Sequence, residues 1–553
     1  MNECTPDHTL LRWASQKPFL TALTGSILML LCFPPVGWWP LAWIAAVPFV
    51  ALIVTPEFKA AKPLRSIWFA GLIYWAIETY YIALPHPALY IAWAMLFSYL
   101  SIYPILFVWI GRKFVHNQNI SVVIAAPIVF TALEWVRAHM LTGFGFSMLA
   151  NSQYKHPIIL QVCDIAGAYG LTFLLILFAA GLFQAIAGKR RTGLVVCIAT
   201  LAFVVGYGFL QPDPAFQPNR ESIDVAVVQG SIDTRFPTSE TEARKYQEQL
   251  ATAYLEQHLA WQRDNQCPRP DLIVWPEGKY PIPHYLPGKD PKFEQVRQEF
   301  RAFHEYLFRP MIEHYYIKAP DDAPPRFNLP AMIVGTTTLD PDSEDAYNSA
   351  LLLGQQGQVT SAYHKMHLVP FGEFVPFVKQ FPFLAKATPI GSGFQRGKKP
   401  VAFRIGEFTA APNVCFESAV AHLLHESLDY LRSSGHEPDF MVNVTDDGWF
   451  YGHCLLDHHL ACNVIRAVEN RMPMIVASNT GFSAFIQSDG KILQQGPRRK
   501  EEILHMDFPL TARRSWYATI ADWPALMMTI LCVLAIILPS RASKKPVDGK
   551  ATE

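Results

Sequence analysis

Long apolar stretches fill most of the chain up to residue 210 and return near its C-terminus. A helix needs about 20 predominantly apolar residues to cross the hydrocarbon core of a bilayer. Stretches that approach or reach this length lie at 19–34, 38–54, 66–84, 88–110, 120–138, 158–187, 193–210 and 518–538. The pattern therefore predicts a multi-pass α-helical membrane bundle, with seven helices before a large domain and one after it.

Between the seventh and eighth stretches, short β-rich runs alternate with helical segments. Strands are predicted at 224–230, 272–275, 331–335, 350–353, 359–363, 401–411, 440–444 and 474–479. Helices are predicted at 239–264, 291–308, 418–434 and 454–470. Such alternation over a long segment is typical of a layered α/β domain.

Composition supports this division. Hydrophobic residues make up 51% of the chain and charged residues 17%, well below the roughly 25% charged residues of a typical soluble domain. The formal net charge is +0, so nothing indicates a nucleic-acid partner. The nine cysteines show no paired spacing of a disulfide scaffold, although the sequence leaves open whether Cys454 and Cys462 form a disulfide bond.

Basic residues are concentrated in every second loop, which predicts the orientation of the chain. They lie at 12–17, 59–65, 112–113, 189–191 and 541–545. The short loops at 34–38 and 84–88 contain none. The predicted segments are a cytoplasmic N-terminus (1–18), a seven-helix bundle (19–210), a periplasmic domain (211–514), a last transmembrane helix (515–539) and a cytoplasmic tail (540–553). In a bacterial envelope, the outer face of such a membrane would be the periplasm and the membrane itself the inner one.

Three ionisable residues, Glu78, Glu134 and Arg137, fall within or beside the predicted spans. Ionisable groups are costly inside a membrane and are often functional there. An intramembrane ion pair, or an arginine that reaches the headgroups, accounts for them equally well.

Reactive side chains follow three predicted strands. Cys415 follows 401–411, Glu277 follows 272–275 and Lys365 follows 359–363. Side chains at strand ends can be held rigidly and directed into a cleft. Taken singly, the cysteine reads as a small buried hydrophobe, the glutamate as a turn residue and the lysine as a surface charge.

Together, glutamate, lysine and cysteine in this order are similar to the three motifs of the nitrilase superfamily. Longer motifs resemble the apolipoprotein N-acyltransferase family within it. These are Trp-Pro-Glu at 275–277, His-Leu-Val-Pro-Phe-Gly-Glu-Phe-Val-Pro at 367–376, Arg-Ala-Val-Glu-Asn-Arg at 466–471, Leu-Thr-Gly-Phe at 141–144, Asp-Ile-Ala-Gly-Ala-Tyr-Gly at 164–170 and Asp-Trp-Pro at 522–524. The resemblance covers nearly the whole chain and implies a nitrilase-like αββα sandwich for the soluble domain.

The resemblance also implies a reaction. A phospholipid would donate an acyl chain to Cys415, and the resulting thioester would pass it to the free amine of a diacylglyceryl-apolipoprotein. Glu277 would be the general base and acid, Lys365 would stabilise the thiolate and the oxyanion, and the N–H of Phe416 would be a second oxyanion donor. Glu373 and Glu417 would orient Lys365 and Glu277. The resemblance implies no cofactor and no metal, and its partners are the two lipid substrates and the membrane lipid.

Several positions depart from the family pattern. Gly145-Phe146 stands where Pro-Trp is usual, Phe416 replaces a tyrosine, and Asp446 replaces the asparagine of an Asn-Asp-x-Trp-Phe-Gly loop. The departures put acyl-donor preference and loop contacts in question.

Other interpretations stay open at this point. A membrane-bound hydrolase would use the same three residues with water as the acceptor, and a non-catalytic lipid binder would keep only the fold. The residues His453, Cys454, Asp457, His458, His459 and Cys462 have the i, i+4 spacing of metal ligands on a helix. The apolar segment 369–387 is predicted to form a lid over the acyl chain.

Overall fold

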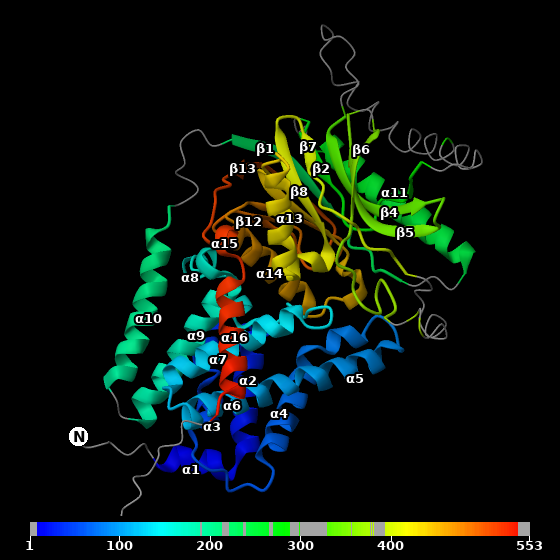
Figure 1. The fold of residues 1–553 in the computed structure, drawn as a ribbon. Coiled ribbons are helices and arrows are strands. Elements are labelled where there is room, and N and C mark those ends of the chain that lie inside the picture. Colours follow the sequence, from blue (N-terminus) through cyan, green and yellow to red (C-terminus); the bar gives the residue numbers. More distant parts are fainter. Residues whose placement is uncertain are drawn as a thin grey trace, which may run out of the picture.

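A bundle of helices and a β-sandwich make up the molecule, with the sandwich stacked on one end of the bundle (Figure 1). The computed structural model describes residues 8–188, 191–212, 221–235, 239–264, 269–287, 329–355, 357–376 and 393–539, together with 298, 378 and 380. Most of the predicted helix at 291–308, and part of the predicted lid at 369–387, lie outside the described residues.

The bundle contains the apolar helices that the sequence predicts. They are α2 (Pro18–Cys32), α3 (Val47–Val54), α4 (Pro63–Glu78), α5 (Leu89–Leu100), α6 (Ile102–Arg112), α7 (Val122–His139), α9 (Cys163–Ala187), α10 (Arg191–Leu210) and α16 (Trp523–Ile537). Within the described ranges, four continuous segments are long and apolar enough to cross a membrane: Leu89–Asn117, Val122–His139, Cys163–Ala187 and Arg191–Leu210. The chain is therefore a membrane protein, while the count of eight crossings stays a prediction.

Short elements complete the bundle. The helix α1 (His8–Gln16) precedes it, and α8 (Pro157–Leu160) and α15 (Tyr517–Ile520) come just before α9 and α16. The last helix, α16, packs beside α7, although the sequence separates them widely (Figure 1).

Helix α9 is kinked at Gly167, whose φ of +65° would strain any residue with a side chain. The kink allows the N–H of Ala168 to donate to Glu469, 2.7 Å away, in α14 (Leu455–Asn470) of the sandwich. The glycine of the motif at 164–170 therefore shapes the contact between the bundle and the sandwich.

The sandwich consists of two sheets. One has the order β13-β1-β2-β4-β5-β6, with β3 paired to β4, and the other has the order β12-β11-β10-β9-β8-β7. The strands are β1 (Glu221–Gln229), β2 (Leu272–Val274), β3 (His284–Tyr285), β4 (Ala331–Asp340), β5 (Asp345–Leu353), β6 (Val359–His364), β7 (Phe403–Ile405), β8 (Phe408–Val414), β9 (Phe440–Thr445), β10 (Met474–Ser478), β11 (Ala484–Ile486), β12 (Ile492–Gln495) and β13 (Glu502–Leu510).

Alternating side chains separate the layers of the sandwich. On β1, Val225 and Val227 pack between the sheets, whereas Ala226 and Val228 face α11 (Glu240–Asp264). On the other side, α13 (Ala421–Ser433) and α14 share one hydrophobic core with the bundle. The order of layers is helix, sheet, sheet, helix, so the predicted αββα class is confirmed, and α13 and α14 join it to the membrane helices.

Candidate active site

Glu277 lies in the turn that follows β2, and the residue is 8% exposed. Its Oε1 accepts a hydrogen bond from Asn348 Nδ2 at 2.6 Å, and its Oε2 accepts one from the N–H of Asp446 at 2.8 Å. Gly335 on β4 makes room for this turn, since a Cβ there would lie 2.4 Å from the Cα of Glu277. The carboxylate is therefore fixed from both sides.

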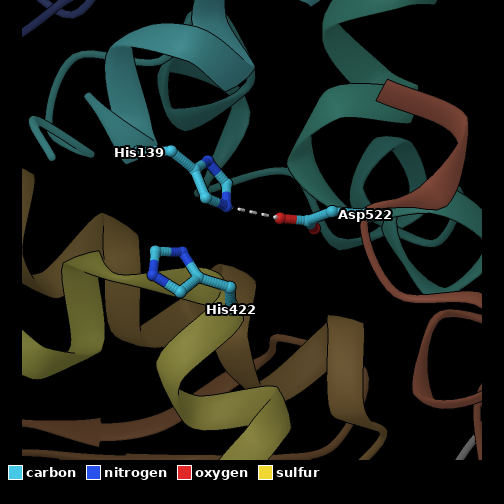
Figure 2. A group of neighbouring side chains, drawn as sticks. All are labelled: His139, His422 and Asp522. Atoms are coloured by element: carbon cyan, nitrogen blue, oxygen red, sulfur yellow. Dashed lines mark ion pairs between the residues drawn. The ribbon is translucent and has the colours of Figure 1, made fainter. Parts of the chain in front are cut away.

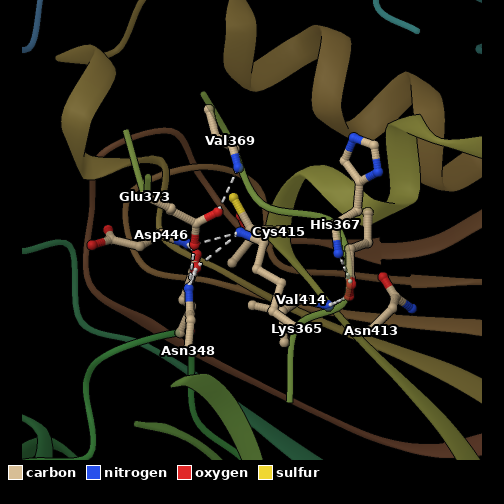
Figure 3. Close-up of polar contacts among 12 residues, drawn as sticks. Asn348, Lys365, His367, Val369, Glu373, Asn413, Val414, Cys415 and Asp446 are labelled. Atoms are coloured by element: carbon tan, nitrogen blue, oxygen red, sulfur yellow. Dashed lines mark hydrogen bonds and ion pairs between the residues drawn. The ribbon is translucent and has the colours of Figure 1, made fainter. Parts of the chain in front are cut away.

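Lys365 follows β6 and is buried beside two carboxylates (Figure 3). Its Nζ lies 2.9 Å from Oε1 of Glu373 and 3.5 Å from Oε1 of Glu277. Asn348 also donates to Glu373, at 2.6 Å, so one amide bridges the two acids. The N–H of Val369 donates to the other oxygen of Glu373 at 2.8 Å, which closes the loop after Lys365.

Cys415 is the first residue after β8 and begins the helical turn η7 (Cys415–Ala419). Its φ is +53°, in the left-handed region that non-glycine residues rarely adopt. Such conformations persist only where the surroundings hold them, and they are concentrated at functional sites. The half-buried thiol interacts electrostatically with both Lys365 and Glu277. The structure thus brings together the three residues that the sequence places at separate strand ends.

Glu417 links the loop of Lys365 to the strand of Cys415. One carboxylate oxygen accepts from the N–H groups of Met366 and His367 at 2.7 and 3.1 Å. The other accepts from the N–H of Val414 at 2.7 Å, and the hydroxyl of Tyr363 donates to both oxygens at 2.9 Å. Among the described residues, the hydrogen bonds of Glu417 go to the backbone around Lys365 and Cys415 and to Tyr363, not to Lys365 or Glu277 themselves.

Burial dominates the electrostatics of the three central groups. Burial and the negative charge of Glu277 raise the pKa of Cys415 well above its usual value, and Lys365 only partly offsets this. Burial also raises the pKa of Glu277, which Lys365 lowers and Glu373 raises further. Burial lowers the pKa of Lys365, but the two carboxylates outweigh it and raise that pKa overall. Burial therefore favours the neutral thiol of Cys415, and the two carboxylates favour the charged form of Lys365.

The carbonyl oxygen of Cys415 accepts two hydrogen bonds, from Nε2 of His459 at 2.9 Å and from Nδ2 of Asn443 at 3.1 Å. Nδ1 of His459 pairs with Asp447 at 3.0 Å. Burial lowers the pKa of His459, but the Asp447 carboxylate, the Cys415 carbonyl and the charge of Glu277 together hold that pKa above its usual value. In a trans peptide the N–H points away from the carbonyl oxygen. The N–H of Phe416 is therefore held on the side opposite His459 and Asn443.

A buried ion pair supports Glu277 from behind. Nζ of Lys279 lies 2.9 Å from Oδ2 of Asp446, and the Lys279 side chain is 2% exposed. The hydroxyl of Thr234 donates to the same oxygen, while Gly448 and Asn479 donate to Oδ1 at 3.1 and 2.8 Å. Because the N–H of Asp446 donates to Glu277, this ion pair helps to fix the position of the Glu277 carboxylate.

The loop after α7, residues 140–147, packs directly on the site. The ring of Phe146 meets that of Phe416 edge-on at 5.2 Å. A Cβ on Gly145 would lie 1.9 Å from the carbonyl oxygen of Ala419, so the two backbones touch. The carbonyl of Thr142 lies 2.8 Å from Nε2 of His367. Part of the wall of the site is therefore supplied by the membrane bundle.

The buried charges of the bundle hold this loop. Arg137 donates to the carbonyls of Phe146 and Ser147 at 3.1 and 3.3 Å and lies 3.6 Å from Glu134. The hydroxyl of Ser147 donates to Glu78 at 2.7 Å. Of the two interpretations of these residues, the structure shows the ion pair and adds a structural role in positioning the loop.

Comparison with known proteins gives the same division of the chain. Residues 25–181 match the model of the apolipoprotein N-acyltransferase N-terminal domain, and residues 224–518 match that of the carbon-nitrogen hydrolases. A protein named apolipoprotein N-acyltransferase from Geobacter metallireducens is 30% identical over 92% of both chains. One of the same name from Rhodopirellula baltica is 27% identical over 95% of this chain and 97% of its own. The chain belongs to the apolipoprotein N-acyltransferase family. It is therefore an acyltransferase with a nitrilase-like domain, as the motifs predict.

Two of the departures from the family pattern have structural counterparts. Gly145-Phe146 forms the contact between the bundle and η7, and Asp446 forms an ion pair with Lys279. Neither displaces the three central residues.

The six residues with metal-ligand spacing on α14 do not converge. His458 lies 3.2 Å from Glu78, His459 pairs with Asp447, and Asp457 pairs with Arg498. Cys454 and Cys462 are both free thiols, so the open question of a bond between them is answered in the negative. These side chains anchor α14 to its neighbours instead.

Sequence reasoning missed Asn348, His459 and Lys279. Asn348 lies within β5, and no local pattern separates it from an ordinary strand residue. Lys279 carried a weak signal, because a lysine next to a buried turn needs a counter-charge. The three-residue β11, the short β12 and the C-terminal β13 were also missed, since their pairing partners are distant or their runs are short.

Proposed function

We propose that this enzyme transfers a fatty acyl chain from a phospholipid to the free N-terminal amine of a diacylglyceryl-apolipoprotein, through a thioester on Cys415. The observation that carries the proposal is the placement of one thiol, one ammonium group and one carboxylate together beside a loop of the membrane bundle. The reaction would take place on the periplasmic side of the bacterial inner membrane.

In the first half-reaction, Glu277 takes the proton of the Cys415 thiol as Sγ attacks the ester carbonyl of the phospholipid. A base is required because the pKa of the thiol is raised. The carbonyl oxygen becomes an oxyanion, which Lys365 and the N–H of Phe416 stabilise. Loss of one such donor typically costs about 10²–10³ in rate. The ester C–O bond then breaks, and Glu277 returns the proton to the lysophospholipid oxygen.

In the second half-reaction, the α-amine of the lipoprotein attacks the thioester and gives a proton to Glu277. The C–S bond breaks, an amide forms, and the proton returns to the thiolate. Glu373 holds the Lys365 ammonium at 2.9 Å, and Glu417 holds the backbone on either side. These two residues are positioning residues.

Water would compete with the amine for the thioester, so the site must exclude it. Phe146 and Phe416 present aromatic surface next to the nucleophile. The predicted lid at 369–387 would cover the remaining side. The aromatic surface of Phe146 and Phe416 supports amine transfer over the alternative of a hydrolase with the same three residues.

The test uses purified protein in detergent micelles, a phospholipid with a labelled acyl chain, and a synthetic diacylglyceryl peptide with a free α-amine. The expected product is the N-acylated peptide, identified by mass, in excess over free fatty acid. A peptide with an acetylated amine is the matched control and should give no product. Label that appears chiefly as free fatty acid in the presence of the free amine would instead identify a hydrolase.

A further inference from the structure

A cluster of three side chains outside the active site joins the two parts of the molecule. His139 ends α7, His422 lies in the first turn of α13, and Asp522 directly precedes α16. One potential ligand atom from each lies within 4.8 Å of the other two. Figure 2 shows the two imidazole rings face to face, with a ring nitrogen of His139 directed at the Asp522 carboxylate. The ring centroids are 4.2 Å apart.

The hydrogen bond at Nδ1 of His139 determines whether Nε2 of that ring presents a hydrogen or a lone pair. Nδ1 lies 2.8 Å from the carbonyl oxygen of Trp135, which can only accept, so Nδ1 carries a hydrogen. In a neutral imidazole, Nε2 then presents a lone pair to the carboxylate of Asp522. A lone pair facing a carboxylate oxygen is repulsive unless a proton or a metal cation lies between the two atoms.

The distance between His139 and Asp522 fits a metal cation better than a proton. Nε2 of His139 and Oδ2 of Asp522 are 3.4 Å apart, longer than the roughly 2.7–2.9 Å of a charge-assisted hydrogen bond. Zinc binds nitrogen and carboxylate oxygen at about 2.0–2.2 Å in a tetrahedron, which places two ligand atoms roughly 3.3–3.5 Å apart. The observed separation matches the edge of that tetrahedron.

The remaining partners leave the ligand atoms available. Oδ1 of Asp522 accepts from the hydroxyl of Tyr517 at 2.8 Å, while Oδ2 is buried without a hydrogen bond. Nδ1 of His422 is likewise buried without one. A histidine ligand almost always donates its other ring N–H to a carbonyl, carboxylate or water, as His139 does to Trp135.

We propose that His139, His422 and Asp522 form a binding site for a divalent transition-metal ion, with Zn²⁺ as the cation that suits two imidazoles and one carboxylate. Water fills the fourth position. The site links the end of α7, the helix that follows the nucleophile turn, and the start of α16. It therefore fastens the catalytic domain to two membrane helices and fixes the loop 140–147 against η7.

The test measures zinc binding to the full-length protein in detergent, in a Cys415→Ser background that removes the reactive thiol as a competing ligand. After chelation and addition of Zn²⁺, elemental analysis is expected to find about one tightly bound zinc per chain. His422→Ala and Asp522→Asn should each weaken binding by at least about 100-fold, because loss of outer-shell partners alone costs about 10–100-fold. His436→Ala, on the same side of the sandwich, is the control and should bind as the parent does.

A spectroscopic measurement on the parent avoids dependence on the variants. Co²⁺ in place of Zn²⁺ should show the visible absorption of a four-coordinate nitrogen and oxygen site, and bound zinc should raise the thermal unfolding midpoint. The proposal is overturned if the parent retains no zinc, if Co²⁺ shows only the spectrum of the hydrated ion, or if the variants bind as tightly as the parent. Failure here leaves the acyl-transfer proposal untouched, because different residues carry it.

Discussion

Restoring the family's usual asparagine at position 446 should damage this particular enzyme. In Asp446→Asn, the Lys279 ammonium loses its carboxylate partner at 2.9 Å and keeps the Thr234 hydroxyl at 3.2 Å. The pKa of Lys279 reflects this dependence: burial lowers it, but the neighbouring acidic groups, with Asp446 the foremost, together raise it above its usual value. The NH₂ group of the new asparagine must also face a group that donates a hydrogen bond to Asp446 in the parent, so two donors would meet there.

The magnitude follows from the burial of the pair. Removing one partner of a buried ion pair costs about 3–5 kcal/mol. For a domain of this order of size, about 1 kcal/mol shifts the melting midpoint by roughly 2–4 °C, so Asp446→Asn should lower it by about 6–20 °C. Lys279→Met should cost less, because the Asp446 carboxylate keeps donors from Thr234, Gly448 and Asn479.

The assay is a double-mutant cycle on thermal unfolding in detergent, with single-turnover acylation measured in parallel. The double variant Lys279→Met/Asp446→Asn has no unpaired charge and should be more stable than Asp446→Asn alone, with a coupling of about 1–3 kcal/mol. Acylation should fall with Asp446→Asn, since the N–H of residue 446 positions Glu277. The reasoning fails if Asp446→Asn is as stable as the parent, or if the double variant is no better than the single one.

Three further changes test separate parts of the site. Glu417→Gln must turn its amide NH₂ toward at least one backbone N–H, so it should destabilise the fold by about 1–3 kcal/mol, and an unchanged unfolding midpoint would contradict this. Glu373→Gln removes a charge that raises the pKa of Glu277. Because Glu277 must be ionised to accept the thiol proton, acylation declines as the pH falls through that pKa. The acidic limb should therefore move to lower pH while the maximal rate drops, and an unmoved limb would count against Glu277 as the base. Gly145→Ala forces the bundle loop away from the nucleophile turn, and a displacement of about 1 Å can cost about 10²-fold in rate. Gly206→Ala, where a Cβ meets nothing within 4 Å, should leave the transfer rate unchanged.

The fold class and the three central residues were within reach of the sequence because their signals are local. A strand is recognisable from its own residues, and a reactive side chain just after it is visible without knowing what the strand pairs with. The hairpin predicted at 401–411 is β7 and β8, and Cys415 follows β8 directly.

The rest of the site depends on residues far apart in the sequence. Asn348 bridges Glu277 and Glu373 from the middle of a strand, and Gly145 meets Ala419 across the junction of bundle and sandwich. No periodicity encodes such contacts. The left-handed backbone of Cys415 is equally hidden, since glycine or asparagine is the usual signal for it.

The central claim is that the acyl chain passes through the sulfur of residue 415. The most direct measurement is the intact mass of the protein after incubation with a phospholipid of defined acyl chains, without acceptor. The account predicts a single acyl adduct on Cys415 that disappears when the diacylglyceryl peptide is added and is absent from Cys415→Ala. Formation of N-acylated peptide by Cys415→Ala at the rate of the parent, or an adduct that the peptide does not discharge, would contradict it.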